Sequence, residues 1–174
     1  MSTLRILGVD PGLNTTGYGV IEVTSGKAKL IEAGVVRGKT KGSLEVRLRE
    51  IHTGIAEVIA ALKPGVVAIE QLYSHYERPR TAILMGHARG VIVLAASLQD
   101  IPVKHYAATQ VKKMLTGAGR SPKTQMQHAV CREFGLLRPP EPPDVADALA
   151  IALCHYYSTR NGLVGSASKS FPRK

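Results

Sequence analysis

Four acidic residues of this chain stand where carboxylates are costly or closely spaced. Asp10 and Glu70 each end a short apolar run. Asp144 and Asp147 lie three residues apart, a spacing that puts two side chains on one face of a helix. Carboxylates that converge repel one another and lose hydration, and a hard divalent ion such as Mg²⁺ or Mn²⁺ offsets both effects. Two such ions about 3.5–4 Å apart could activate water for phosphodiester hydrolysis.

Each of these carboxylates also has an ordinary structural explanation. Asp10 opens an Asp-Pro-Gly tripeptide that suits a turn, and Glu70 could be the first solvated residue after a strand. Asp144 as a helix N-cap, with Asp147 three residues later, would resemble a capping box and suit the helix dipole. The combination favours a shared site, because the carboxyl ends of neighbouring parallel strands meet at one edge, where open α/β sheets place their sites.

The net charge of the chain favours a polyanionic partner. Lys and Arg number 23 against 13 Asp and Glu, which leaves +10 at pH 7. Such a charge promotes encounter with nucleic acid and says nothing about the fold. An acidic cluster inside a basic protein is the charge pattern of a nuclease.

Other chemistries find less support. The chain has no GxxxxGK[ST] loop, and its histidines form no HExxH motif. The GVDPG stretch is similar to the first phosphate loop of actin-like ATPases, but those enzymes need two such lobes and this chain is too short for both. Cys131 and Cys154 are too few for a disulfide framework.

Hydrophobic periodicity and breaker residues predict one α/β domain with a mixed sheet, a size that 174 residues suit. The predicted order is βββαβαβααα, and Ser25-Gly26 links the second and third strands as a hairpin. We expect the domain to span residues 1–160 and residues 161–174 to form a flexible basic tail. The predicted strands cover 5–10, 17–24, 27–37, 66–70 and 102–106, and the predicted helices cover 43–62, 80–99, 109–115, 123–134 and 144–159.

The predicted helix at 80–99 has no wholly polar face. Apolar residues surround it, and Gly86 and Gly90 add small residues four apart. A helix that is apolar nearly all round needs cover on two sides. The domain's own sheet can cover one side, and we expect a second copy of the chain to cover the other. Burial wholly within one chain is the alternative.

Six short motifs follow one another along the chain. They are GVDPG at 8–12, TGYGV at 16–20, AIEQ at 68–71, HARG at 87–90, QVK at 110–112 and DVADALAIA at 144–152. Each is weak alone, but the ordered set resembles the RuvC family of bacterial Holliday-junction resolvases over residues 4–157. The resemblance implies a ribonuclease H-like fold, with a five-stranded mixed sheet flanked by helices, and a homodimer.

The resemblance also implies an activity and its metal ligands. It implies symmetric nicking of two strands of like polarity in a four-way DNA junction, in recombination and repair. Mg²⁺ is the implied cofactor, with two ions in each site and Mn²⁺ as a substitute. The implied ligands fall on Asp10, Glu70, Asp144 and Asp147. A branch-migration helicase complex, RuvA–RuvB, is an implied partner.

Contacts with the DNA are implied at further positions. An aromatic residue that stacks at the junction centre corresponds to Tyr73. Two functional lysines of the family correspond to Lys112 and Lys123, which could bind the scissile phosphate or stabilise developing charge. We expect additional phosphate contacts from other basic residues, namely Arg78, Arg80, Lys113 and Arg120.

Two other functions stay open at this point: a related nuclease acting on RNA or RNA–DNA hybrid, and a non-catalytic junction-binding protein. The aromatic residue after Glu70 and the apolar helix favour the dimeric resolvase. The four retained carboxylates argue against a pure binder, since they would repel phosphates. We expect a cytoplasmic protein, because no signal-peptide pattern is visible and the longest apolar stretch, Val91–Leu98, is too short to span a bilayer.

Overall fold

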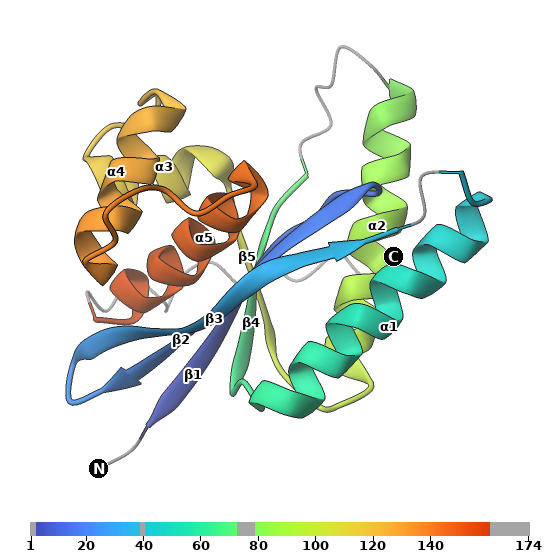
Figure 1. The fold of residues 1–174 in the computed structure, drawn as a ribbon, viewed down its shortest axis with the longest axis horizontal. Helices are drawn as coiled ribbons and strands as arrows, with labels where there is room; N and C mark the ends of the chain where they lie inside the picture. The colour runs from blue at the N-terminus through green and yellow to red at the C-terminus, as the bar shows by residue number, and fades with distance from the viewer. Residues whose placement is uncertain (1–2, 39–40, 73–78, 161–174) are drawn as a thin grey trace, which may run out of the picture.

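A single five-stranded sheet forms the centre of the molecule (Figure 1). The computed structural model describes residues 3–38, 41–72 and 79–160. The strand order is β3-β2-β1-β4-β5, with antiparallel pairs among the first three and parallel pairs from β1 to β4 and from β4 to β5. The strands are β1 (Leu4–Asp10), β2 (Thr15–Thr24), β3 (Lys27–Arg37), β4 (Val66–Glu70) and β5 (Val103–Tyr106). The helices are α1 (Leu44–Leu62), α2 (Pro79–Ser97), α3 (Ala108–Thr116), α4 (Lys123–Phe134) and α5 (Pro143–Arg160).

Helices cover both faces of this sheet, and each face has its own core. On one face, α1 and α2 pack over Leu7 and Val9 of β1. On the other face, α3, α4 and α5 pack over Ile6 and its neighbours. Successive residues of β1 thus serve opposite cores, which is why its sequence is apolar nearly throughout.

The helix α5 lies unusually close to β1 and β2, because glycines on these strands leave room for it. A Cβ on Gly8 would stand 2.1 Å from the backbone oxygen of Ala148. A Cβ on Gly17 would stand 2.1 Å from the backbone oxygen of Asp144. Any larger residue at these two strand positions would push α5, and the acidic residues that it carries, away from the sheet.

The predicted element order and sheet type are confirmed, and most boundaries agree within two residues. The Ser25-Gly26 hairpin is confirmed, with both residues at positive φ as a two-residue type I′ turn requires. The alternative explanation of Asp144 as a helix N-cap is wrong, since α5 begins at Pro143 and places Asp144 inside its first turn. Proline is favoured at a first helical position because its φ is already helical and its missing N–H costs nothing there.

None of the helices in the described ranges combines the length and apolar content that crossing a bilayer requires. The expected tail at 161–174 lies outside the described residues.

Candidate active site

The carboxyl ends of β1 and β4 bring Asp10 and Glu70 together. These strands are parallel neighbours with Val9 opposite Ile69, so one further step along the register sets Asp10 beside Glu70. Side chains alternate across a sheet, and Ala68, two residues before Glu70, belongs to the core that α5 completes. Both carboxylates therefore project from the face that α5 covers.

The first turns of α5 bring Asp144 and Asp147 to the same edge. Gly17 pairs with Asp10 across the β1–β2 ladder, and the backbone of Asp144 rests directly on Gly17. Asp147 follows nearly one helical turn later, on the same side of α5. The predicted convergence of strand-end and helix carboxylates is therefore present in the structure.

Burial and mutual repulsion both disfavour the charged forms of the carboxylates at the two strand ends. Burial, followed by the charges of Asp147, Glu70 and Asp144, raises the pKa of Asp10 to about 8, and Lys123 acts in the opposite direction. Burial and the charge of Asp147 also raise the pKa of Glu70, against the influence of Lys112 and Lys123. Desolvation is the largest cause at both strand ends, so the site is costly to ionise without a cation.

Two lysines stand against this acidic cluster. The Lys123 ammonium lies 2.7 Å from Asp147 Oδ2, and this contact raises the pKa of Lys123. Lys112 of α3 and Lys123 of α4 both line a hollow of about 230 Å³ together with Glu70 and Asp147. The two lysines that the family resemblance implied therefore lie at the site, one on each flanking helix.

The donor set suits a hard divalent cation. Asp147 Oδ1 is buried and finds no hydrogen-bond partner within the described part of the chain, which leaves an acceptor that a cation would satisfy. Carboxylate oxygens are the ligands that Mg²⁺ and Mn²⁺ prefer. Across residues 3–38, 41–72 and 79–160, no group of three or more His, Cys, Asp or Glu side chains is already arranged to hold a metal ion. Binding would therefore require these side chains to adjust, and the Lys123–Asp147 ion pair is the contact that competes.

One residue at the site was not singled out from the sequence. Arg89 of α2 donates from Nε to the backbone oxygen of Glu70, over 3.0 Å, from the opposite layer of the molecule. Its Nη2 lies 2.5 Å from His105 Nδ1 on β5. The available signal was a single arginine in the middle of a strongly apolar helix, a residue that rarely enters such surroundings unpaired.

The other residues predicted to contact DNA either do not line the hollow beside Glu70 or lie outside the described residues. Arg80, Lys113 and Arg120 are exposed on α2, on α3 and after α3, and none of them lines the hollow beside Glu70. Tyr73 and Arg78 lie outside the described residues. Lys112 and Lys123 are thus the predicted basic residues that the structure brings to the carboxylates.

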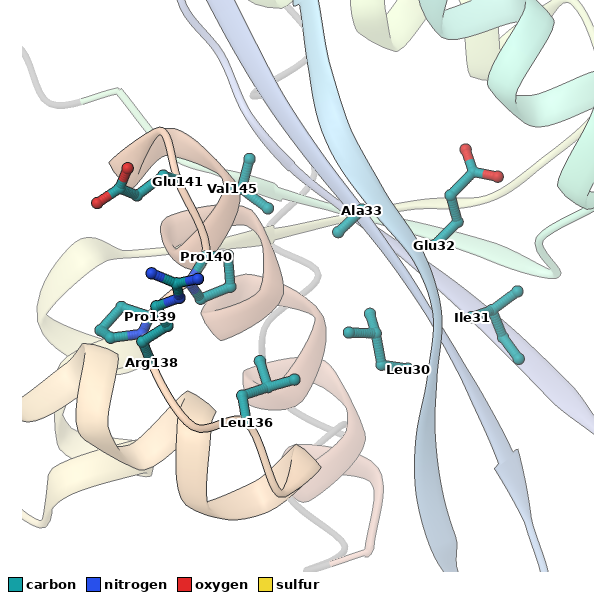
Figure 2. A pocket seen from close by; sticks show the side chains of 10 residues that line it. All are labelled: Leu30, Ile31, Glu32, Ala33, Leu136, Arg138, Pro139, Pro140, Glu141 and Val145. Carbon is teal, nitrogen blue, oxygen red and sulfur yellow. The ribbon is translucent and has the colours of Figure 1, made fainter.

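A larger hollow, of about 700 Å³, lies elsewhere, between β3 and the connection from α4 to α5 (Figure 2). Leu30 of β3 and Leu136 of the connection lie across it from one another (Figure 2). None of the four clustered carboxylates lines this hollow. Its mostly apolar walls offer no comparable chemistry, so the smaller, charged hollow is the candidate active site.

Comparison with known proteins adds an independent finding. Residues 6–155 match the model of the family described as crossover junction endodeoxyribonuclease RuvC. The protein of that name from Rhodopirellula baltica is 56% identical over 156 residues, which are 90% of this chain and 88% of that protein. The structure of T. thermophilus RuvC in complex with a Holliday junction substrate is similar with a TM-score of 0.85 and 34% identity, and covers 91% of this chain and 96% of that one.

A more distant structure supports the fold alone. The yeast mitochondrial Holliday junction resolvase Ydc2 has a TM-score of 0.63 at 11% identity, over 91% of this chain and 82% of that one. The predicted ribonuclease H-like fold, a five-stranded mixed sheet flanked by helices, is confirmed.

Proposed function

Because this chain belongs to the RuvC family of crossover junction endodeoxyribonucleases, we propose that it resolves four-way DNA junctions by hydrolysing phosphodiester bonds. The observation that carries the proposal is the convergence of Asp10, Glu70, Asp144 and Asp147 at one sheet edge, in a protein of net charge +10. A DNA-binding protein without catalytic activity would gain nothing from four clustered carboxylates, because they repel the phosphates of the DNA.

These four carboxylates would hold two divalent metal ions. The ions would be Mg²⁺, and Mn²⁺ could substitute for it. When bound, the ions supply Lewis acidity that activates water and stabilises the leaving oxygen. The raised pKa of Asp10, about 8, means that metal binding near neutral pH must displace a proton from this site. Asp147 Oδ1 supports the same assignment, because none of the described residues donates a hydrogen bond to this buried acceptor.

The lysines would act on the phosphate rather than on the metal. Lys123 holds Asp147 Oδ2 and half of its side chain is exposed, so release from Asp147 leaves an ammonium at the mouth of the hollow. There it can hold an oxygen of the scissile phosphate and stabilise charge that develops during hydrolysis. Lys112, on the neighbouring helix, lines the same hollow and offers a second cation.

A homodimer is part of this proposal, with α2 at its seam. Ile83 and Leu94 are 62% and 49% exposed, and among the described residues no atom beyond α2's own nearby backbone stands within 4 Å of a Cβ built on Gly90. Together with Gly86, these residues recur at three- and four-residue spacing along one side of α2, here called the α2 stripe. A two-fold dimer presents two equivalent sites, which matches two equivalent strands of like polarity in a four-way junction.

The remaining parts of the proposal concern the DNA surface and its partners. Tyr73 would stack at the junction centre, and Arg78, Arg80, Lys113 and Arg120 would hold phosphates without reading sequence. The RuvA–RuvB helicase complex would act with the enzyme in the cytoplasm. Residues 161–174, which carry three basic side chains, would follow the nuclease domain of residues 1–160 as a flexible tail.

Cleavage of a synthetic four-way junction tests the proposal. Wild-type protein and Asp10→Asn are each incubated with the junction, with linear duplex and with RNA–DNA hybrid, in Mg²⁺ or in EDTA. We expect paired nicks confined to the junction, dependent on Mg²⁺ and lost in Asp10→Asn while binding to the junction persists. Cleavage of hybrid alone would assign a different substrate, and binding without cleavage would make the protein a junction binder.

A further inference from the structure

We propose that Arg89 is a positioning residue for Glu70, which it holds by the backbone from the far face of the sheet. Arg89 lies on α2, whereas the Glu70 side chain projects toward α5. The guanidinium reaches the end of β4 with Nε, which donates to the Glu70 carbonyl oxygen over 3.0 Å. The inference rests on the proposed function, because it concerns the geometry of one proposed metal ligand.

The Glu70 carbonyl needs a donor from outside the sheet. The backbone N–H of Gln71 donates to the backbone carbonyl oxygen of Tyr106 on β5, over 2.8 Å. The C=O of Glu70 and the N–H of Gln71 belong to one trans peptide group and point in opposite directions, so the carbonyl of Glu70 faces β1. In the parallel register that sets Val9 opposite Ile69, the next donor on β1 would be residue 11.

Residue 11 is a proline and has no N–H to give. The β1–β4 ladder therefore stops one hydrogen bond short, at the residue that carries a candidate metal ligand. An unpaired carbonyl there would leave the end of β4 without a backbone hydrogen bond to fix it. Where that carbonyl is buried, it would also lower the free energy of unfolding. Arg89 supplies the missing donor, with the stronger hydrogen bond of a charged group.

His105 holds the guanidinium in place from β5. Its Nδ1 lies 2.5 Å from Arg89 Nη2, and the two residues share the face of the sheet opposite the carboxylates. Burial and the charges of Arg89 and Lys104 lower the pKa of His105, which favours a neutral ring that can accept this hydrogen bond. The guanidinium is thus fixed at two points, and one of them is the backbone of Glu70.

A pair of substitutions tests the assignment. Arg89→Ala removes the donor, and Pro11→Ala in the same chain returns a backbone N–H to the place where the ladder stops. The first readout is the increase in thermal stability that Mn²⁺ produces without DNA, titrated to its midpoint. The second is kcat and KM for nicking of the four-way junction. Arg49→Ala, an exposed arginine of α1, is the control for loss of a positive charge.

We expect Arg89→Ala to raise the Mn²⁺ midpoint and to lower kcat by about tenfold or more, with KM for the junction nearly unchanged. Pro11→Ala in the Arg89→Ala background should recover part of both losses, which a general loss of packing would not allow. Arg89→Lys keeps the charge but loses the guanidinium fork that reaches both the Glu70 carbonyl and His105, so it should fold and show a smaller shift in the same direction. It serves as the test variant if Arg89→Ala does not fold.

Two results would overturn the inference. One is a wild-type Mn²⁺ midpoint and kcat in Arg89→Ala or Arg89→Lys. The other is a raised KM with unchanged kcat, which would make Arg89 a DNA contact. Failure of the proposed function looks different, because the wild-type protein itself would then show no Mn²⁺ response and no nicking.

Discussion

The helices α2 and α5 are both rich in apolar residues, but they differ in how much of their surface the rest of the chain buries. Neither α2 nor α5 has a wholly polar face. Twelve of the 18 residues of α5 are buried, because the sheet lies beneath it and α3 and α4 lie against its outer side. Only four of the 19 residues of α2 are buried, and large apolar side chains of its outer face remain exposed.

The position of the glycines explains this difference. Beneath α5 the glycines lie on the strands, at Gly8 and Gly17, and the helix backbone fills the space above them. On α2 the glycines lie on the helix itself, and no other element of the described residues fills the space beside Gly90. Both helices are apolar nearly all round and have glycines nearby. For α5 this pattern marks a contact that is completed within the chain, and for α2 it marks a surface that we propose another molecule covers. The completed contact carries half of the carboxylates, and the open one is the proposed dimer seam.

A matched pair of alanine substitutions gives the largest expected contrast. Gly8→Ala would set a Cβ 2.1 Å from the backbone of Ala148, and we expect it to lower the free energy of unfolding by about 3 kcal/mol or more. In Gly90→Ala the added Cβ meets no neighbouring element of the described structure within 4 Å, and we expect the change to raise the stability of the single chain by up to about 1 kcal/mol. Denaturant unfolding at concentrations that favour the monomer measures both. Equal effects would remove the distinction between the helices.

The acidic site beside α5 predicts a stability that depends on pH. The pKa of Asp10 rises from 3.8 to about 8 on folding, so in this interval the folded chain binds the proton more tightly than the unfolded chain. The free energy of unfolding of the metal-free protein should therefore fall as pH rises from about 4 to about 8, and then level off.

Asp10→Asn should remove most of this dependence. At about pH 9 we expect the variant to melt roughly 5 °C or more above the wild type without metal, and at about pH 5 to melt close to it. Asp100→Asn, at an exposed position after α2, is the matched change of charge and should leave the pH profile of the wild type intact. A wild-type profile without slope between these pH values would contradict the account of the site.

A substitution at Gly90 should have the smallest effect on the stability of the monomer, but it should clearly weaken the dimer. Gly90→Leu adds a large side chain to the α2 stripe, where the single chain has room for it. We expect a weakening of the dimer by about tenfold or more, with little change in the stability of the monomer. Sedimentation over a range of concentrations measures the dissociation constant. An unchanged dimer would remove α2 from the interface.

Local pattern was sufficient to predict most of the fold and the four carboxylates. Alternation and periodicity fix the elements, and apolar runs that end in Asp10 and Glu70 indicate buried strands whose ends meet. Contacts between distant segments could not be predicted in this way. The approach of Gly8 to Ala148, the Lys123–Asp147 ion pair and the hydrogen bond from Arg89 to Glu70 each join separate elements. The start of α5 was predicted to within one residue, but the N-cap explanation for Asp144 failed for a local reason, since both Pro143 and Asp144 suit the beginning of a helix.

The central claim is that each chain builds one complete site beside α5 and that α2 joins two such chains into the enzyme. A dimer of one wild-type and one Asp10→Asn chain, purified through two different tags, tests most directly whether each chain carries one complete site and paired nicking needs two. Its substrate is a supercoiled plasmid with an extruded cruciform, on which the wild-type dimer should make linear product by paired nicks. The mixed dimer should make one nick and yield nicked circles. Linear product from the mixed dimer would contradict the claim, because a single intact site would then have cut both strands.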